Sequence, residues 1–453
     1  MQSHEESGSV YLLQKPNRLQ DDYGLVYMCF TMLGVGALLP WNTFLAPSDY
    51  YSALYPNSPF YFLMSMAYNS TGIIALLLSI KFGQRLSFGV RIVPVLIIEL
   101  LVLASVPLLT HFVPHKLSMW LVLALVFVTG FISAILFSSV VGLASLFPPQ
   151  YVGAVMTGNG IAGIVTAGLR IITKVSLSTT ENSMEISGGI YFGIAAAVQI
   201  LVLLSYFLLV RRPFAVFCLA TSGNSKENHV GYVPVVSSPP SRVPSYAGIQ
   251  QEEKRGVRSP PENESMPLFQ SRPSSIATVM GKVWPQALNA FFVFFVTLSV
   301  FPGVSNEIKP HEKEGPNWYP EWFQIILITL FMIFDFIGRA LPRWFRFPSK
   351  YLWVLVLSRF VFFALFLLMV LGGPIIQSDP SAFVVMSLLA ISNGYCGSLS
   401  MMYGPQYVDP HEKERAGAVM SFALNLGIFV AICFSTLPLY LIKGSLRSIV
   451  FGG

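Results

Sequence analysis

Long apolar runs separated by short polar segments recur along most of this chain. Eleven of these runs are about 20 residues or longer, the length that an α-helix needs to cross a bilayer core about 30 Å thick. They lie at about 24–45, 60–81, 90–110, 119–147, 151–173, 189–210, 283–305, 321–341, 351–372, 382–403 and 416–441. The pattern predicts an all-α polytopic membrane protein with eleven transmembrane helices.

Residues 211–282 break this pattern. They are rich in Ser, Pro and charged residues, as in Ser238-Pro239-Pro240-Ser241, and contain few apolar residues. Such a composition cannot bury enough surface to offset the entropy of ordering, so it predicts a disordered loop. The expected organisation is a cytoplasmic tail (1–23), a six-helix bundle (24–210), the cytoplasmic loop (211–282), a five-helix bundle (283–441) and an extracytoplasmic tail (442–453).

Composition supports the membrane assignment. Only 11% of the 453 residues are charged and 54% are hydrophobic, whereas a soluble protein has about 25% charged residues. This excludes a soluble enzyme, a nucleic-acid-binding domain and a disulfide-stabilised secreted module. The four cysteines are scattered and the six histidines fall in tails or loops, so we expect neither a metal site nor a cofactor. The sequence has no phosphate-binding loop, so by elimination it predicts a secondary or facilitative transporter and no enzymatic activity.

The Lys and Arg residues of the short loops predict the orientation, because these residues concentrate on the cytoplasmic side of a membrane. With the N-terminus in the cytoplasm, the inner loops contain Lys81, Arg85, Arg91, Arg343, Arg346, Lys350, Lys413 and Arg415, and the outer loops contain Lys116, Lys174, Lys309 and Lys313. This bias predicts a cytoplasmic N-terminus and, with an odd number of spans, an extracytoplasmic C-terminus. We expect the plasma membrane, with an endosomal or vacuolar membrane as the alternative.

The eighth span contains two charged residues, Asp335 and Arg339. A charge at bilayer depth is costly, so such residues normally face a bundle interior or an aqueous cavity. Because the two residues are four apart, they share one helix face and can form an ion pair. One interpretation is a polar patch that binds solute hydroxyl groups or closes a transport gate. The alternative is a structural pair in which Arg339 extends to the membrane interface.

Other polar residues in the spans also need partners. Glu99 is isolated in the third span, where it is either a proton-sensitive site or the partner of a basic residue on another helix. Arg170 ends the fifth span, where extension to the interface is an equal alternative to a functional role. The fifth span also carries small residues at intervals of four, which favour close helix packing: Ala154, Gly158, Ala162 and Thr166. Asn159 lies beside them and needs a helix neighbour or a solute as its partner.

Two further segments combine small, polar and helix-bending residues. In the first span Pro40 should bend the helix and form a gate element, and Trp41 is either part of that gate or an interfacial aromatic residue. In the tenth span Ser392-Asn393-Gly394-Tyr395 suits tight packing or a hydrated cavity, and the pattern alone does not separate the two.

Several of these segments resemble motifs of the equilibrative nucleoside transporters. The resemblance covers nearly the whole chain, and its motifs are specific when taken together. They are Leu39-Pro40-Trp41-Asn42, Ala154-Val155-Met156-Thr157-Gly158, Phe301-Pro302-Gly303, Phe334-Asp335-Phe336-Ile337-Gly338-Arg339, Ser392-Asn393-Gly394-Tyr395 and Arg415-Ala416-Gly417.

The resemblance implies a major-facilitator-like 6+5 two-bundle architecture and a monomer that moves nucleosides, and sometimes nucleobases, down their gradient without sodium. It also implies that Asp335 and Arg339 bind the ribose and the base. The other substrate positions that it implies are Met32, Trp41, Asn69, Phe301 and Ile428, with Pro302 as the partner of Phe301. Gating or structural roles are expected for Pro40, Gly158, Pro302 and Asn393.

The chain departs from the family pattern at two positions, and it differs from the monoamine-transporting branch at a third. Phe137 stands where many members have a glutamine that reads the base, so an amide is replaced by a ring that stacks on a base. Met332 stands where an asparagine is common. Asn159 stands where the monoamine-transporting branch has a glutamate, which argues against an organic cation as the substrate.

We therefore expect an equilibrative nucleoside transporter that works by alternating access, with adenosine and uridine as substrates and the lipid bilayer as its surroundings. Two alternatives stay open. One is a proton-coupled nucleoside transporter or an organic-cation transporter of the same family, with Glu99 or Asp335 as the titrating group. The other, from a different class, is a membrane receptor or scaffold that signals through residues 211–282.

Overall fold

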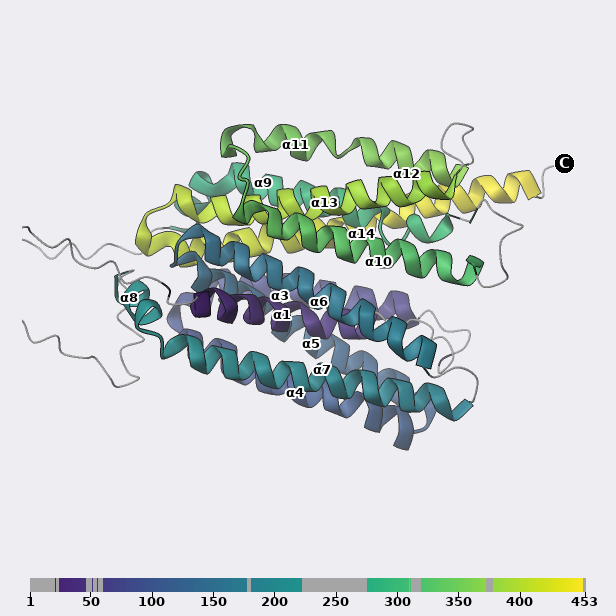
Figure 1. Ribbon diagram of the computed structural model, residues 1–453, viewed down its shortest axis with the longest axis horizontal. Coiled ribbons are helices and arrows are strands. Elements are labelled where there is room, and N and C mark those ends of the chain that lie inside the picture. Colours follow the sequence, from purple (N-terminus) through teal and green to yellow (C-terminus); the bar gives the residue numbers. More distant parts are fainter. Residues whose placement is uncertain are drawn as a thin grey trace, which may run out of the picture.

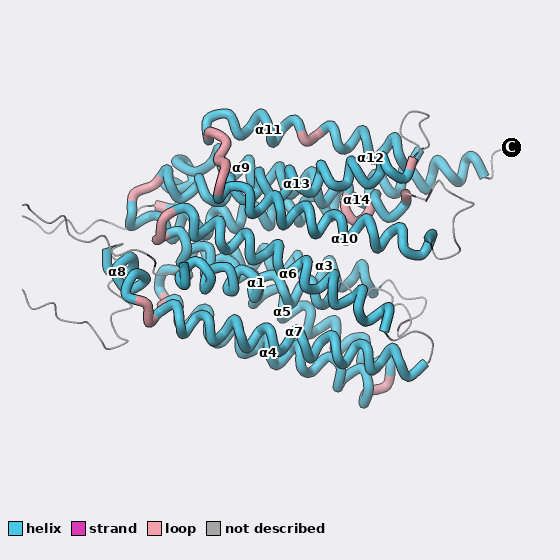
Figure 2. Tube along the Cα trace, in the orientation of Figure 1, coloured by secondary structure: helices cyan, strands magenta, loops and turns pink. Residues whose placement is uncertain are grey.

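The computed structural model describes residues 21, 24–45, 51, 55, 60–176, 181–221, 275–308, 310, 319–371 and 378–450. Within these ranges the chain is helical, with short 3-10 turns and no strand (Figure 2). The helices are α1 (Leu25–Leu45), α3 (Phe60–Phe82), α4 (Phe88–Phe112), α5 (His115–Ser145), α6 (Pro149–Ser176), α7 (Glu181–Val210), α8 (Pro213–Thr221), α9 (Ile276–Val300), α10 (Tyr319–Ala340), α11 (Leu352–Ser358), α12 (Val361–Leu371), α13 (Asp379–Tyr403) and α14 (Lys413–Val450).

The helices form two bundles that lie side by side. Helices α1 to α7 make the first bundle and helices α9 to α14 make the second, with α8 at one end of the first (Figure 1). The described residues contain eleven segments that are long and apolar enough to cross a membrane, as the hydrophobic pattern predicted. We call the end of the molecule where α8 lies the α8 end.

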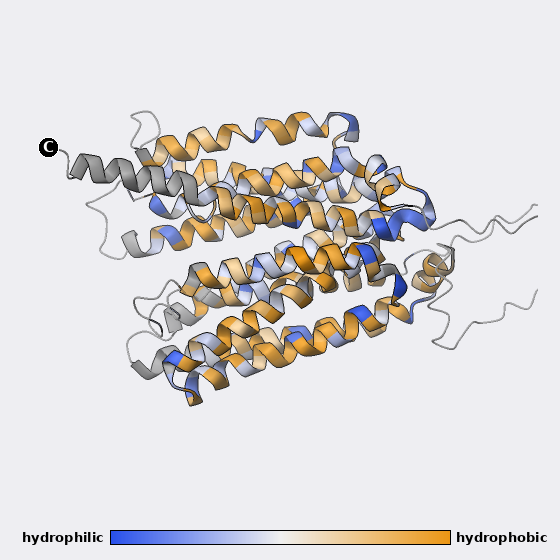
Figure 3. Cartoon of the chain, turned by 180° about the vertical axis from the view of Figure 1, so that it is seen from behind, coloured by the Kyte–Doolittle hydropathy of each residue, from blue (hydrophilic) through white to orange (hydrophobic). Residues whose placement is uncertain are grey.

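The outer surface explains why this chain needs a membrane. Long apolar side chains are exposed along the helices, including Leu101 at 62% and Leu204 at 57%. Hydrophilic residues gather mainly at the two ends of the bundles, while apolar residues cover their length (Figure 3). An apolar belt between polar ends matches a bilayer and would be unfavourable in water.

The structure differs from the expected loop at both of its ends. Helix α8 lies within residues 211–282, where a disordered segment was expected, because its nine residues are too short to span a bilayer but are apolar enough to pack against the first bundle. Phe214 in α8 packs against Tyr151, with ring centroids 5.8 Å apart. Residues 222–274 and 1–20 lie outside the described residues.

Helix α9 begins at Ile276, ahead of the expected start of the seventh span at residue 283. This earlier start includes Lys282 in the helix, and its ammonium group binds Asp409 at 3.0 Å and Glu412 at 2.7 Å. The charge is therefore accommodated at the end of the bundle. Helix α14 also continues beyond residue 441, where its apolar run ends, because hydropathy marks the span and not the end of the helix.

The ninth span is broken in the middle. Helix α11 ends at Ser358 and helix α12 begins at Val361, with Arg359 between them. The sequence predicted one continuous span over residues 351–372 and did not single out this arginine. Helix α1, by contrast, continues past Pro40 to Leu45.

Candidate functional site

Two glycines bring helices α10 and α13 of the second bundle into backbone contact. A Cβ atom on Gly394 would overlap with the carbonyl oxygen of Asp335, and one on Gly338 would overlap with the carbonyl oxygen of Ile391. Only residues without a side chain permit so close an approach. The crossing places Asn393, the residue before Gly394, beside the side chain of Asp335.

Asp335 and Arg339 form the ion pair that their spacing predicted. The Nε of Arg339 donates to Oδ2 of Asp335 at 2.6 Å, and both side chains are buried. The second oxygen of Asp335 accepts a hydrogen bond from Nδ2 of Asn393 at 2.7 Å. Since both partners hydrogen-bond the carboxylate directly, they offset the cost of burying its charge. The structure thus brings three of the sequence-predicted residues together.

The polar cluster continues to a buried residue that the sequence analysis missed. Oδ1 of Asn393 accepts a hydrogen bond from the hydroxyl of Thr297 at 2.8 Å, and Thr297 in turn accepts one from Nη2 of Arg359 at 2.5 Å. Arg359 is only 2% exposed. Its signal was present in the sequence, because a charge in the middle of an apolar span marks a buried polar site.

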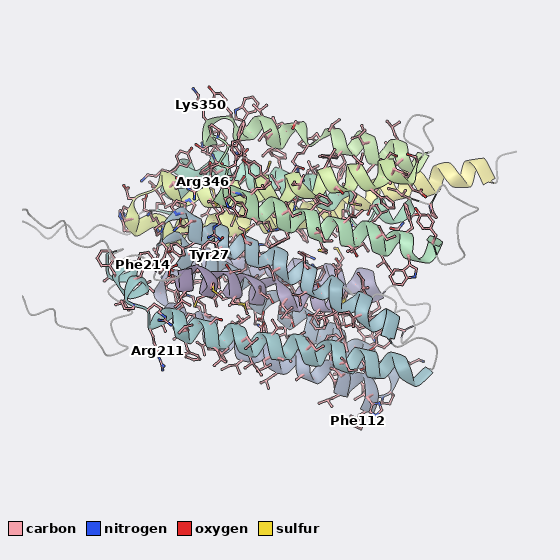
Figure 4. All side chains as sticks on the ribbon, in the orientation of Figure 1. Tyr27, Phe112, Arg211, Phe214, Arg346 and Lys350 are labelled. Carbon is pink, nitrogen blue, oxygen red and sulfur yellow. The ribbon has the colours of Figure 1, made fainter. Side chains whose placement is uncertain are left out.

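A cavity of about 210 Å³ opens between the two bundles at the α8 end. It is lined by Asp21, Gly24, Tyr27, Gln150, Tyr151, Gly153, Thr157, Arg339, Ala340, Pro342, Arg343, Arg346 and Met402. Tyr27 of the first bundle and Arg346 of the second lie at this end of the molecule, opposite Phe112 (Figure 4). Arg339 therefore pairs with Asp335 and also lines this opening, and its role in binding a solute stays a prediction.

Helices α1 and α6 of the first bundle cross at a second glycine pair. A Cβ on Gly158 would overlap with the carbonyl oxygen of Thr31, and one on Gly34 would overlap with that of Val155. The next residue, Asn159, is buried, and its Oδ1 has no hydrogen-bond partner in the described part of the chain. Its Nδ2 has only the sulfur of Met156, at 4.0 Å. The close packing expected at Gly158 is present, whereas a contact between Asn159 and a solute stays a prediction.

The apolar residues expected at the site fall into separate groups. Phe137 belongs to the large buried cluster against which Met32 and Ile428 also pack. Phe301 belongs to another cluster and stacks on Phe331 with ring centroids 4.0 Å apart. These groupings describe packing and leave the assignment of the residues to the substrate site as a prediction.

Two of the predicted substrate-binding residues, Trp41 and Asn69, lie in the first bundle. Trp41 packs on Tyr68, with ring centroids 4.4 Å apart. Asn69 donates from Nδ2 to the backbone oxygen of Ser65 within its own helix at 2.8 Å. Pro302 is half-buried beside Phe301. The side chain of Arg170 lies outside the described residues.

Glu99 is completely buried in the first bundle, and its partners are neutral rather than basic. Its two carboxyl oxygens accept hydrogen bonds from Oγ of Ser133 at 2.5 Å and from Nε2 of Gln199 at 2.7 Å. Ser133 also interacts with the hydroxyl of Tyr68, the residue that packs on Trp41. The sequence indicated that Glu99 needs a partner but could not identify it, because both donors come from other helices.

An ion pair joins the two bundles at the α8 end. Nη2 of Arg91 in α4 lies 2.7 Å from Oε1 of Glu414 in α14, and both side chains are 9% exposed. Nearby, a Cβ on Gly417 of α14 would lie 3.0 Å from the Cα of Gly142 in α5. Arg91 was predicted to be a loop charge, and this contact was not visible in the sequence because its partner lies 323 residues further along the chain.

No group of three or more His, Cys, Asp and Glu residues in the described ranges has an arrangement that could hold a metal ion. The polar cluster around Asp335 consists of carboxylate, guanidinium, amide and hydroxyl groups. Carboxylate, amide and guanidinium groups supply both acceptors and donors for hydroxyl groups.

Comparisons with known proteins agree with the motifs. A family model described as "Nucleoside transporter" matches residues 123–438. The human protein "Equilibrative nucleoside transporter 1" is 30% identical over 463 residues, covering 92% of this chain and 97% of the relative. The human "Equilibrative nucleoside transporter 2" is 30% identical over 454 residues, covering 90% of this chain and 95% of the relative. The Arabidopsis thaliana "Equilibrative nucleotide transporter 8" is 26% identical over 422 residues, covering 90% of this chain and 94% of the relative.

A solved structure shares the fold. The major facilitator superfamily proton:xylose symporter XylE, bound to 6-bromo-6-deoxy-D-glucose, aligns with a TM-score of 0.60 over 94% of this chain and 89% of its own. Its sequence identity is 12%, so the match supports the architecture of two helical bundles and nothing about the solute.

Proposed function

This chain belongs to the nucleoside transporter family, and from that premise we propose that it is a facilitative, sodium-independent carrier of nucleosides such as adenosine and uridine. The observation that carries the proposal is the buried cluster of Asp335, Arg339 and Asn393, which reaches the space between the bundles through Arg339. A ribose presents hydroxyl groups that both donate and accept hydrogen bonds, and this cluster supplies the complementary groups.

The base is expected to bind apolar and aromatic side chains. In this proposal Met32, Phe137 and Ile428 line its pocket, with Trp41 and Phe301 at its two ends and Asn69 and Asn159 as polar contacts. The unpartnered Oδ1 of Asn159 supports a contact with the solute, because a buried polar atom without a partner is costly until a ligand satisfies it. Nucleobases without ribose are expected to bind less well, since they lack the hydroxyl groups that would donate hydrogen bonds to Asp335.

Transport would proceed by alternating access, with the two bundles rocking about the central solute. We infer that the α8 end is cytoplasmic, because Arg211, Arg346 and Lys350 lie there (Figure 4) and such residues concentrate on the inner side. The Arg91–Glu414 pair then holds the two bundles together on the cytoplasmic side, and it would break if the bundles separate further there. The N-terminus would be cytoplasmic, the membrane would be the plasma membrane, and the carrier would work as a monomer.

The experiment is uptake of radiolabelled adenosine and uridine into proteoliposomes, with and without an inward proton gradient. We expect uptake that equilibrates in both conditions. Asp335→Ala should abolish most of it, whereas Asp409→Ala, which removes an exposed carboxylate from an ion pair in the same bundle, should not. Normal uptake by a folded Asp335→Ala protein would refute the assignment. Absence of flux in the parent protein would refute the function and favour the receptor or scaffold alternative.

Proton coupling is the second candidate, and Glu99 is the observation that favours it. The groups that face its carboxyl group in the described chain are Ser133 of α5 and Gln199 of α7, with Tyr68 of α3 beyond Ser133, and none of them is a cation. A buried carboxyl group without a cation can be neutralised by a proton. Accumulation of nucleoside above equilibrium only with the proton gradient, and its loss in Glu99→Gln, would establish this candidate. Inhibition of uptake by monoamines would instead favour an organic-cation carrier.

A further inference from the structure

Arg359 is a buried cation that no carboxylate contacts in the described part of the chain. It lies at the break between α11 and α12, where its guanidinium group reaches α9 and α13. Nη1 donates to the carbonyl oxygen of Val293 at 2.7 Å, and Nε donates to Oγ of Ser392 at 3.0 Å. Nη2 donates to Oγ1 of Thr297 at 2.5 Å. Burying a guanidinium group is costly, and the acceptors that hold Arg359 are neutral. Its presence therefore needs a reason beyond packing.

The contact with Thr297 fixes the direction of a chain of hydrogen bonds. A guanidinium group only donates, so the hydroxyl oxygen of Thr297 must accept, and its single hydrogen remains for one acceptor. Two acceptors lie within its reach, Oδ1 of Asn393 at 2.8 Å and the carbonyl oxygen of Val293 in the preceding helical turn at 3.1 Å, and Asn393 makes the shorter contact. The hydrogen of Thr297 is therefore directed to Asn393.

From the Thr297 side, this direction favours the same orientation of the Asn393 amide that the acceptor-only carboxylate of Asp335 requires. With Oδ1 accepting from Thr297, Nδ2 points to Oδ1 of Asp335 and donates to it at 2.7 Å. If the amide were rotated by half a turn, its oxygen would face the carboxylate, and two acceptors would repel each other. Asp335 is then held on one oxygen by Asn393 and on the other by Arg339.

We propose that Arg359 is a positioning residue for the solute site, acting on Asp335 through Thr297 and Asn393. Arg359 itself does not touch the solute. It fixes the polarity of the hydrogen-bond chain and thereby the orientation in which Asp335 meets the ribose hydroxyl groups. The inference rests on the proposed function, since it takes Asp335 to be a substrate-binding residue.

The test measures Vmax/KM for uridine uptake into proteoliposomes with Thr297→Val. Valine has nearly the same shape as threonine but cannot relay a hydrogen bond, so it breaks the chain while Arg359 keeps its other acceptors. Because a hydrogen bond to a charged group is involved, we expect Vmax/KM to fall by about tenfold or more. Arg359→Lys should behave in the same way, because an ammonium group cannot reach all four acceptors, which include the carbonyl oxygen of Leu389 at 3.5 Å from Nη2, in the geometry of a guanidinium fork.

The matched control is Ser392→Ala, which also removes an acceptor of Arg359 but lies outside the chain to Asp335. It should change Vmax/KM by less than about twofold, as expected for a site with no special role. The second control introduces Thr297→Val into Asp335→Asn. If the hydrogen-bond chain from Arg359 (the relay) acts through Asp335, Thr297→Val should have almost no further effect on Vmax/KM in the Asp335→Asn background, since the effects of coupled residues are not additive.

The outcomes separate the relay from the proposed function. Normal uptake by Asp335→Asn alone would refute the solute site. Impaired uptake by Asp335→Asn with normal uptake by folded Thr297→Val would refute only the relay. If Thr297→Val lowers Vmax/KM equally in the parent protein and in Asp335→Asn, Arg359 has a packing role instead. The same conclusion follows if Thr297→Val and Ser392→Ala lower Vmax/KM equally. If Arg359→Lys does not fold, Thr297→Val decides the question by itself.

Discussion

The α1–α6 crossing in the first bundle and the α10–α13 crossing in the second are both built on a pair of glycines. In each crossing, a side chain on either glycine would overlap with a carbonyl oxygen of the facing helix. Yet the residues beside the glycines differ. Asn393 joins a buried ion pair and a hydrogen-bond chain, whereas the Oδ1 of Asn159 has no partner in the described chain.

The comparison shows that close packing and chemistry are set by different residues. The glycines determine how near two helices approach, and the neighbouring side chains determine what is buried there. The second crossing is complete in itself, because each of its buried charges has hydrogen-bond partners. The first leaves the amide oxygen of Asn159 without a partner in the described chain, and a buried polar atom of this kind calls for an explanation. The two crossings therefore differ: one contains a paired polar cluster, and the other contains an unpaired amide oxygen.

The largest expected effect comes from breaking the ion pair of the second crossing. Asp335→Ala leaves Arg339 buried without its carboxylate, which should destabilise the protein by about 3–5 kcal/mol. The measurement is the thermal unfolding midpoint of the purified protein in detergent, compared with that of Asp409→Ala. Equal midpoints for the two variants would show that the buried ion pair contributes no more to stability than the exposed one.

The glycines of the two crossings should be similarly intolerant. Gly394→Ala and Gly158→Ala each place a Cβ against backbone, which cannot move as a flexible side chain does, so each should destabilise by about 1–3 kcal/mol. Gly189→Ala, where nothing lies within 4 Å of the added Cβ, is the control. A lower midpoint for Gly394→Ala than for Gly158→Ala would show that the polar cluster adds to the cost of separating the helices. If neither variant has a lower unfolding midpoint than the parent protein, the close backbone contacts are disproved.

Glu99 tests whether the first bundle contains a polar cluster of its own. Glu99→Ala removes the acceptor of both Ser133 and Gln199 and should cost about 1–3 kcal/mol of stability, since buried donors lose their partner. Glu99→Gln keeps one oxygen acceptor and should retain more of the stability. If the alanine variant unfolds at the same temperature as the parent, the hydrogen bonds of Glu99 contribute nothing to the fold.

The smallest effect on stability is expected at Asn159. Because its amide oxygen has no partner in the described chain, Asn159→Ala should change stability by less than about 0.5 kcal/mol. If the amide binds the solute, KM for nucleoside uptake should rise severalfold in the same variant. A large loss of stability with unchanged KM would show that Asn159 is structural, and the contrast between the crossings would then be lost.

Much of the fold could be predicted because the bilayer imposes a simple pattern. Eleven apolar runs gave eleven spans, and the spacing of Asp335 and Arg339 gave their ion pair, since residues four apart meet on any helix. The break in the ninth span was not visible, because Arg359 interrupts it without a proline or glycine. Contacts between distant segments were equally hidden, as for Arg91 and Glu414.

By itself, the sequence determined the class of the protein, the number of its spans and the residues that cannot face lipid. These follow from local composition and helical periodicity, because the cost of placing a charge in a bilayer does not depend on the fold. Only the tertiary structure decided how those residues pair. It showed that the Ser392–Tyr395 segment makes a close helix contact and also supplies a polar partner, with Gly394 meeting the backbone of α10 and Asn393 donating to Asp335. The physical reason is that hydrogen bonds between helices depend on their crossing, and the crossing is set by contacts between segments far apart in the chain.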